Sequence, residues 1–213
     1  MSIFLMKPDN SSLEVSRGIE SIDINIVLIL VKADVEEVAQ ALTQLKPWDG
    51  WIPNAYGQSV PSNEGTLIFK LRGHSWSYVC QPFGHTHPMR LSEADALSLS
   101  DLLSAAVIDY VGSNTGGWFR YLFCNQGRLD ERLRFEEYDR DGNLEFQSQR
   151  GFTAKDIKDA YTFTLNFIRE QDAYIPALKM RYSALKVQQV TLHIENLMPT
   201  EIERMDYLYK TLS

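Results

Sequence analysis

The sequence has little of what stabilises a secreted or membrane protein. It holds two cysteines in 213 residues, Cys80 and Cys124, without a CxxC spacing, so both are interpreted as buried free thiols and not as a disulfide framework. The longest apolar run, residues 24–31, is less than half of the roughly 20 residues that a membrane helix needs. The N-terminus lacks the basic and then apolar pattern of a signal peptide. We therefore expect a cytoplasmic protein that does not bind a membrane.

Positive charge is also scarce. Lys and Arg number 21 against 28 Asp and Glu, a net charge of −7, and no basic block occurs. Because proteins that bind the phosphate backbone present concentrated positive charge, we expect no nucleic-acid partner. The acidic balance favours a basic protein as partner, although it is also normal for a soluble protein.

Signatures of common enzymes are missing as well. The sequence contains no GxxxxGK[ST], GxGxxG, GxSxG or HExxH pattern. These patterns position a phosphate cradle, a nucleophilic serine or a catalytic zinc ion. We expect no cofactor. The sequence does not decide whether the protein is an enzyme or a non-enzymatic module.

The first half of the chain is predicted to alternate strands and helices, from its hydrophobic periodicity. Asp34, three residues before Glu37, has the spacing of a capping box and starts the first helix. Leucines at helical spacing, followed by Gly112, predict a second helix. The predicted elements are a strand over 22–31, a helix over 34–46, a hairpin over 66–79, a helix over 91–111 and a strand over 118–124.

The second half is predicted as a β-meander followed by helices. Turn signals at 125–127 and 139–143 separate three alternating segments, which predicts a three-stranded antiparallel meander over 118–149. Two further capping patterns, each a Thr followed three residues later by an acid, open helices. These helices are predicted from Thr153 towards Asp172 and from Thr200 to Leu212.

The fold class that these elements indicate is α+β, an antiparallel sheet with helices on one face. The order strand, helix, strand, strand, helix, strand fits a ferredoxin-like βαββαβ core, which the meander and the C-terminal helices would extend. We divide the chain into a sheet core over 1–152 and a C-terminal helical extension over 153–213 that packs on the same domain. Such a fold hosts many functions and specifies none.

The one histidine cluster of the sequence is a candidate metal site. In an extended segment His85 and His87 point the same way, so both could bind one divalent metal ion. A third ligand could be Cys80 or a carboxylate such as Asp95. No second pair at fixed spacing completes a zinc site, and the alternative is that both histidines are turn residues beside Pro88. With metal bound, the site would serve a small metal-dependent hydrolase.

The segment 46–56 carries an unusual number of aromatic residues for a loop rich in Pro, Gly and Asn. Trp48, Trp51 and Tyr56 are candidate binding residues, because Trp and Tyr bring large contact area and a polar tip to an interface. The alternative is that they fix the loop to its own core.

The first function hypothesis is therefore a non-enzymatic protein-binding or regulatory module, for example an immunity-type inhibitor of a basic toxin. The second is the metal-dependent hydrolase built on His85 and His87, and a small-molecule sensor is a third. A homodimer is a further expectation, and the sequence leaves open whether the last helix docks on its own chain or is exchanged between two chains.

Overall fold

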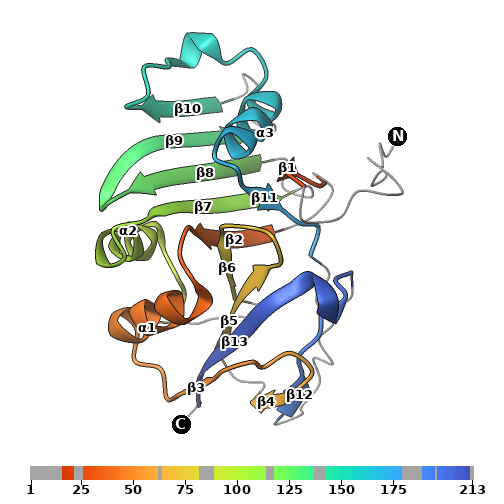
Figure 1. The fold of residues 1–213 in the computed structure, drawn as a ribbon. Helices are drawn as coiled ribbons and strands as arrows, with labels where there is room; N and C mark the ends of the chain where they lie inside the picture. The colour runs from red at the N-terminus through yellow and green to blue at the C-terminus, as the bar shows by residue number, and fades with distance from the viewer. Residues whose placement is uncertain are drawn as a thin grey trace.

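An antiparallel sheet of nine strands forms the centre of the molecule (Figure 1). The computed structural model describes residues 16–21, 26–61, 64–81, 89–113, 118–136, 143–178, 189–194 and 196–211. The strands of the sheet are β2 (Ile26–Val31), β3 (Gly50–Ile52), β5 (Glu64–Leu71), β6 (Ser77–Cys80), β7 (Ala106–Ser113), β8 (Trp118–Asn125), β9 (Arg128–Glu136), β10 (Asn143–Ser148) and β13 (Ile202–Lys210). Their order is β10-β9-β8-β7-β2-β6-β5-β13-β3, and every neighbouring pair is antiparallel.

Three helices and two short strand pairs complete the described fold. The helices are α1 (Val35–Leu45), α2 (Glu93–Leu102) and α3 (Ala160–Glu170), with 3-10 turns η2 (Ala154–Asp156) and η3 (Pro199–Glu201). The strand pairs are β1 (Gly18–Ile19) with β11 (Tyr174–Ile175), which is parallel, and β4 (Ser59–Pro61) with β12 (Gln189–Thr191), which is antiparallel. Among the described residues, no helix is long and apolar enough to cross a membrane.

The helices lie on both faces of the sheet. Alternate residues of β8 show this, because Leu122 joins the core under α1 and α2 whereas Tyr121 joins the core under α3. The α+β class with a large antiparallel sheet is thus present, but the expectation that the helices cover one face is wrong. The reason is that the central strands are apolar on both faces: β2 is buried at four consecutive residues from Leu28 to Val31.

Four central strands carry two of the three helices. They lie in the order β7-β2-β6-β5, α1 follows β2 in the chain, and α2 connects β6 to β7. Leu42 of α1 and Leu99 of α2 are fully buried in the same cluster with Val31. Both helices therefore cover the same face of these four strands. This face is called the helix face below, and the opposite one is called the α3 face.

Several local predictions are confirmed. The β5–β6 hairpin and the β8–β9–β10 meander are both present. In α1, Asp34 and Glu37 form the reciprocal contacts of a capping box, and the backbone N–H of Asp34 donates to Glu37 Oε2 over 3.1 Å.

The predicted second helix is wrong over its second half. α2 ends at Leu102, and the chain turns at Ser104, which has a positive φ of 47°. Residues 106–113 are β7, which pairs with β2 and β8. The run Val107-Ile108-Asp109-Tyr110-Val111 is β-branched and aromatic, which favours a strand, while its apolar residues happen to continue the helical spacing of α2.

The predicted final helix is also wrong. Helical structure is limited to η3, where the backbone N–H of Met198 donates to Glu201 Oε2 over 2.8 Å. Residues 202–210 are β13, which lies between β5 and β3 in the central sheet. The third helix begins later than predicted, at Ala160, where the Asp159 side chain accepts from the backbone N–H of Thr162 over 2.7 Å.

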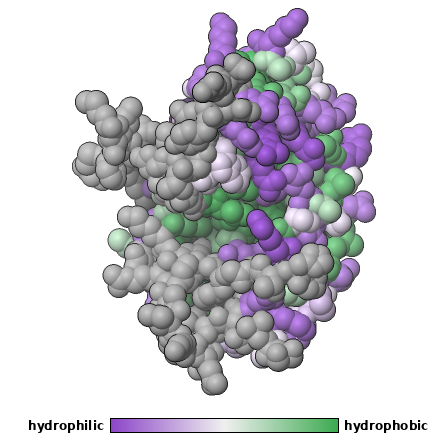
Figure 2. Space-filling view, turned by 180° about the vertical axis from the view of Figure 1, so that it is seen from behind, coloured by the Kyte–Doolittle hydropathy of each residue, from purple (hydrophilic) through white to green (hydrophobic). Residues whose placement is uncertain are grey.

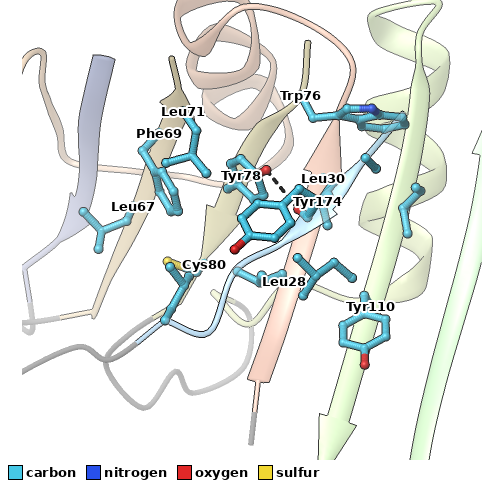
Figure 3. Packing of buried hydrophobic residues seen from close by; sticks show 14 of the residues in the cluster. Leu28, Leu30, Leu67, Phe69, Leu71, Trp76, Tyr78, Cys80, Tyr110 and Tyr174 are labelled. Carbon is cyan, nitrogen blue, oxygen red and sulfur yellow. Dashed lines mark hydrogen bonds between the residues drawn. The ribbon is translucent and has the colours of Figure 1, made fainter. Parts of the chain in front are cut away.

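The core on the α3 face is rich in aromatic side chains (Figure 3). Tyr78 stacks on Phe69 with ring centroids 4.9 Å apart, and its hydroxyl donates to the backbone oxygen of Tyr174 over 2.9 Å. Trp76 is fully buried, and its indole N–H donates to the backbone oxygen of Gln171. These bonds satisfy polar tips that would otherwise be costly to bury.

Candidate functional site

Trp48 and Trp51 both pack on the helix face. The indole N–H of Trp48 donates to the backbone oxygen of Leu42, the last buried residue of α1, over 3.2 Å. Trp51 belongs to the edge strand β3, and its indole N–H donates to Asp206 Oδ2 over 2.9 Å. Both indoles thus contact their own chain while each ring keeps part of its surface exposed.

Tyr56 is separated from the two tryptophans by the sheet. It packs with the core of the α3 face and meets His193 edge to face, with ring centroids 5.6 Å apart. The three aromatic residues that the sequence groups together therefore lie in two places. Trp48 and Trp51 share one surface, and Tyr56 does not belong to it.

Asp206 is the centre of a buried polar network beside Trp51. It is fully buried in β13 and accepts two hydrogen bonds of 2.9 Å from the guanidinium of Arg204. It also accepts from the backbone N–H of Asn54 over 3.1 Å. Asn54 adopts a positive φ of 53°, a conformation that Asn tolerates better than most residues. A charged carboxylate is buried here at low cost, because a cation and several donors surround it.

A groove of about 410 Å³ adjoins this network, between the first turn of α1 and strands β5 and β13. Arg204 reaches from Asp206 to Glu36 Oε2 over 2.9 Å, and Lys70 Nζ lies 2.6 Å from Asp34 Oδ1. Both cations are thus engaged by carboxylates, and the lining has four carboxylates against two cations. The residues that line the groove are Asp34, Val35, Glu36, Glu37, Gln40, Lys70, Glu203 and Arg204.

A second, smaller pocket of about 70 Å³ lies where α2 begins, over β7 to β10. Glu93, the first residue of α2, bonds the guanidinium of Arg120, and its other oxygen accepts from Arg132 over 2.7 Å. The residues that line the pocket are Glu93, Asp109, Arg120, Tyr121, Leu122, Arg132, Leu133, Arg134 and Glu145. We call this site the arginine pocket.

Figure 2 views the molecule from behind and shows hydrophilic side chains gathered over the upper part of the molecule, beside a hydrophobic area.

Asp109 is the buried carboxylate of the arginine pocket. Its side chain is 6% exposed, and Oδ2 lies 3.5 Å from the guanidinium of Arg120. Burial raises the pKa of Asp109 to about 6; Arg120 lowers it and Glu93 raises it further. Asp109 is therefore a candidate functional residue, because strongly perturbed pKa values cluster at functional sites.

A third polar cluster lies on the α3 face, and its side chains bond to one another. The fully buried Glu131 accepts from the hydroxyls of Tyr121 over 2.6 Å and Ser148 over 2.5 Å, and Arg150 lies 3.2 Å away. Arg150 also pairs with Glu170 of α3. These contacts connect β8, β9, β10 and α3, so the cluster acts as a structural link.

The predicted metal site is only partly within the described residues. His85 and His87 lie outside them. Cys80 is buried on the α3 face in β6, and burial raises the pKa of its thiol. Asp95 caps α2 at Ser92 and pairs with Lys46 over 3.0 Å. Within the described ranges, no three His, Cys, Asp or Glu side chains gather as a metal site.

Sequence reasoning missed Asp109 and Asp206, the two buried carboxylates next to the cavities. Each is a single acid within an apolar run, in Val107-Ile108-Asp109-Tyr110-Val111 and in Met205-Asp206-Tyr207-Leu208. In a strand this pattern indicates a buried acid, but apolar spacing alone predicts a helix over both runs. A lone carboxylate in a buried strand must find partners, and so it indicates a polar site.

Comparison of the chain with protein families, curated proteins and solved structures finds no match.

Proposed function

We propose that this protein is a non-enzymatic protein-binding module that recognises a basic protein partner at the groove between α1 and β13, with Trp51 as an adjacent anchor. The observation that carries the proposal is the charge of the groove: four carboxylates line it, and its two cations are already paired. A lysine or arginine of a partner would add a charge that the groove lacks. An immunity-type inhibitor of a basic toxin is one form of this function.

The neighbouring tryptophan supports the choice of this surface. Trp51 is partly exposed, while its indole N–H is held by Asp206, so the ring is oriented before any partner arrives. Interface anchors are often aromatic residues of this kind, because a fixed ring loses little entropy on binding. Arg204 connects Asp206 to Glu36 and thereby couples the ring to the edge of the groove.

We also propose that β2, α1, β5, β6, α2 and β7 form a ferredoxin-like core. The strand order β7-β2-β6-β5, the antiparallel pairing and the position of both helices on one face support this topology. β13 and β3 then extend the core at one edge, and the meander extends it at the other.

The function can be tested with random peptides displayed on phage and selected on the purified protein. We expect the selected peptides to be enriched in Lys and Arg. They should lose at least about tenfold in affinity for the variant Glu36→Gln, Glu37→Gln, Glu203→Gln, since charge-assisted hydrogen bonds contribute about 1.5 to 3 kcal/mol each. Gln at residue 37 retains an acceptor for the capping box, so α1 should remain folded.

A matched control removes the same number of charges from the α3 side, in the variant Asp156→Asn, Glu170→Gln, Asp172→Asn. It should bind the selected peptides as the wild type does. Equal losses of affinity in both variants would mean that only the net charge of the protein matters. If the selected peptides lacked basic residues, the groove would be ruled out as the binding surface.

A further inference from the structure

The arginine pocket has hydrogen-bonding capacity that its own residues do not use. Arg120 and Arg132 both reach Glu93, and each guanidinium carries five donors. The Nε of Arg132 is buried, and no described residue accepts from it. The side chains of Arg120 and Arg132 are 33% and 44% exposed, so their remaining N–H groups can donate to an added oxygen atom.

The surroundings of these donors favour a small negative group. The pocket of about 70 Å³ suits only a small group, because pockets for drug-sized ligands measure about 300 to 1,000 Å³. Leu122, buried in the core of the helix face, lines the pocket together with the arginines, so a charge-assisted hydrogen bond is less screened there than in water. The N-terminus of α2, a helix of ten residues, begins at Glu93 and adds a positive dipole end.

We propose that the arginine pocket binds a single oxyanion group, a carboxylate, phosphate or sulfate, between Arg120 and Arg132. This site is distinct from the groove at α1, because it lies over β7 to β10 on the other side of α2. The bound oxygen accepts from the exposed terminal N–H groups of Arg132 and shares the guanidinium of Arg120 with Glu93.

Asp109 makes this binding depend on pH. Above a pH of about 6 its carboxylate is charged and competes for Arg120, whereas below that pH it is neutral and leaves Arg120 to the anion. The charged groups around it are Glu93 of α2, Arg120 of β8, Arg132 and Arg134 of β9 and Glu145 of β10; β2 presents the apolar Ile29 opposite to it. Anion affinity therefore rises as the pH falls, and by linkage the bound anion raises the pKa of Asp109.

Titration with sulfate, followed by NMR of the backbone amides, tests the site at constant ionic strength set with chloride. We expect saturable shifts confined to the start of α2 and to β8 and β9. The affinity should be about fivefold or more higher at about pH 5 than at about pH 8. Formate serves as the carboxylate probe, and both ions keep their charge over this range.

Two variants assign the binding to named residues. Arg132→Gln should weaken sulfate binding about tenfold, while Lys155→Gln, which removes one exposed positive charge in η2, should leave it unchanged. Asp109→Asn should bind with the low-pH affinity of the wild type at both pH values. Shifts that do not saturate, equal effects of the two charge variants, or a pH dependence that survives in Asp109→Asn would each overturn the proposal. If Arg132→Gln fails to fold, the Asp109→Asn titration decides.

Discussion

The two faces of the sheet use polar side chains differently. On the α3 face, three buried tyrosines direct their hydroxyls to acceptors of the same chain: Tyr78 to a backbone oxygen, Tyr121 to Glu131, and Tyr207 to the backbone oxygen of Pro61 over 2.8 Å. On the helix face, Asp109 and the groove carboxylates border cavities instead.

This difference indicates where binding is to be sought. A polar group that is fully satisfied inside a packed core stabilises the fold and has no capacity left for a ligand. A charged group at the edge of a cavity keeps that capacity. The α3 face therefore serves mainly stability, and the helix face carries both proposed binding sites.

The largest effect is expected from Phe167→Ala on the α3 face. Phe167 is 2% exposed, stacks on Tyr121 with ring centroids 4.4 Å apart and meets Phe123 edge to face. Its removal should lower the free energy of unfolding by about 3 to 5 kcal/mol, measured by urea denaturation. Phe152→Ala, at an exposed ring, is the control, with an expected loss of about 1 kcal/mol or less. Equal losses would contradict the assignment of the core to this face.

The next effect is a pH dependence that comes from Asp109. Its carboxyl keeps a proton up to a pH of about 6 in the folded protein but ionises near 3.8 when unfolded. The folded state thus binds the extra proton, and its stability should fall by about 2 to 3 kcal/mol as the pH rises from about 4 to about 6. Urea denaturation over this range should show the fall in the wild type relative to Asp109→Asn. If the stabilities of the two proteins changed with pH in the same way, the raised pKa of Asp109 would be contradicted.

Trp51→Phe should destabilise the protein more than Trp48→Phe does. The Trp51 indole donates to a buried carboxylate, Asp206, and losing such a bond costs about 1.5 to 3 kcal/mol. Trp48 donates to a neutral backbone oxygen, for which about 0.5 to 1.5 kcal/mol is expected. Thermal or urea unfolding of the two variants measures the difference. The opposite order would mean that ring packing, and not the polar network, holds this segment.

The smallest effect is expected from Leu97→Gln on the outer surface of α2. Leu97 is 37% exposed, so the change should stay within about 0.5 kcal/mol of the wild type. Gel filtration should give the same elution volume for both proteins. A larger loss, together with a change in size, would show that a second copy of the chain covers α2.

Local signals predicted much of the fold. α1 follows from its capping box and apolar spacing, and the two hairpins of the meander follow from alternation broken by turn residues. The same kind of signal misled at 106–113 and at 202–210, where apolar residues fit a helical stripe by spacing alone. The sequence predicts the candidate sites less well: it indicates Trp51 as a binding residue, but the partner of Trp51, Asp206, lies 155 residues away.

By itself the sequence determined the α+β class, the acidic charge and the elements whose capping and turn residues lie next to one another in the chain. Only the tertiary structure decided that β7 and β13 are strands, because each pairs with strands far away in sequence: β7 with β2, and β13 with β5 and β3. It also decided which charges meet. Asp109, Arg120 and Glu93 come from β7, β8 and α2, and their shared pocket exists because antiparallel pairing and helix packing bring the three elements together.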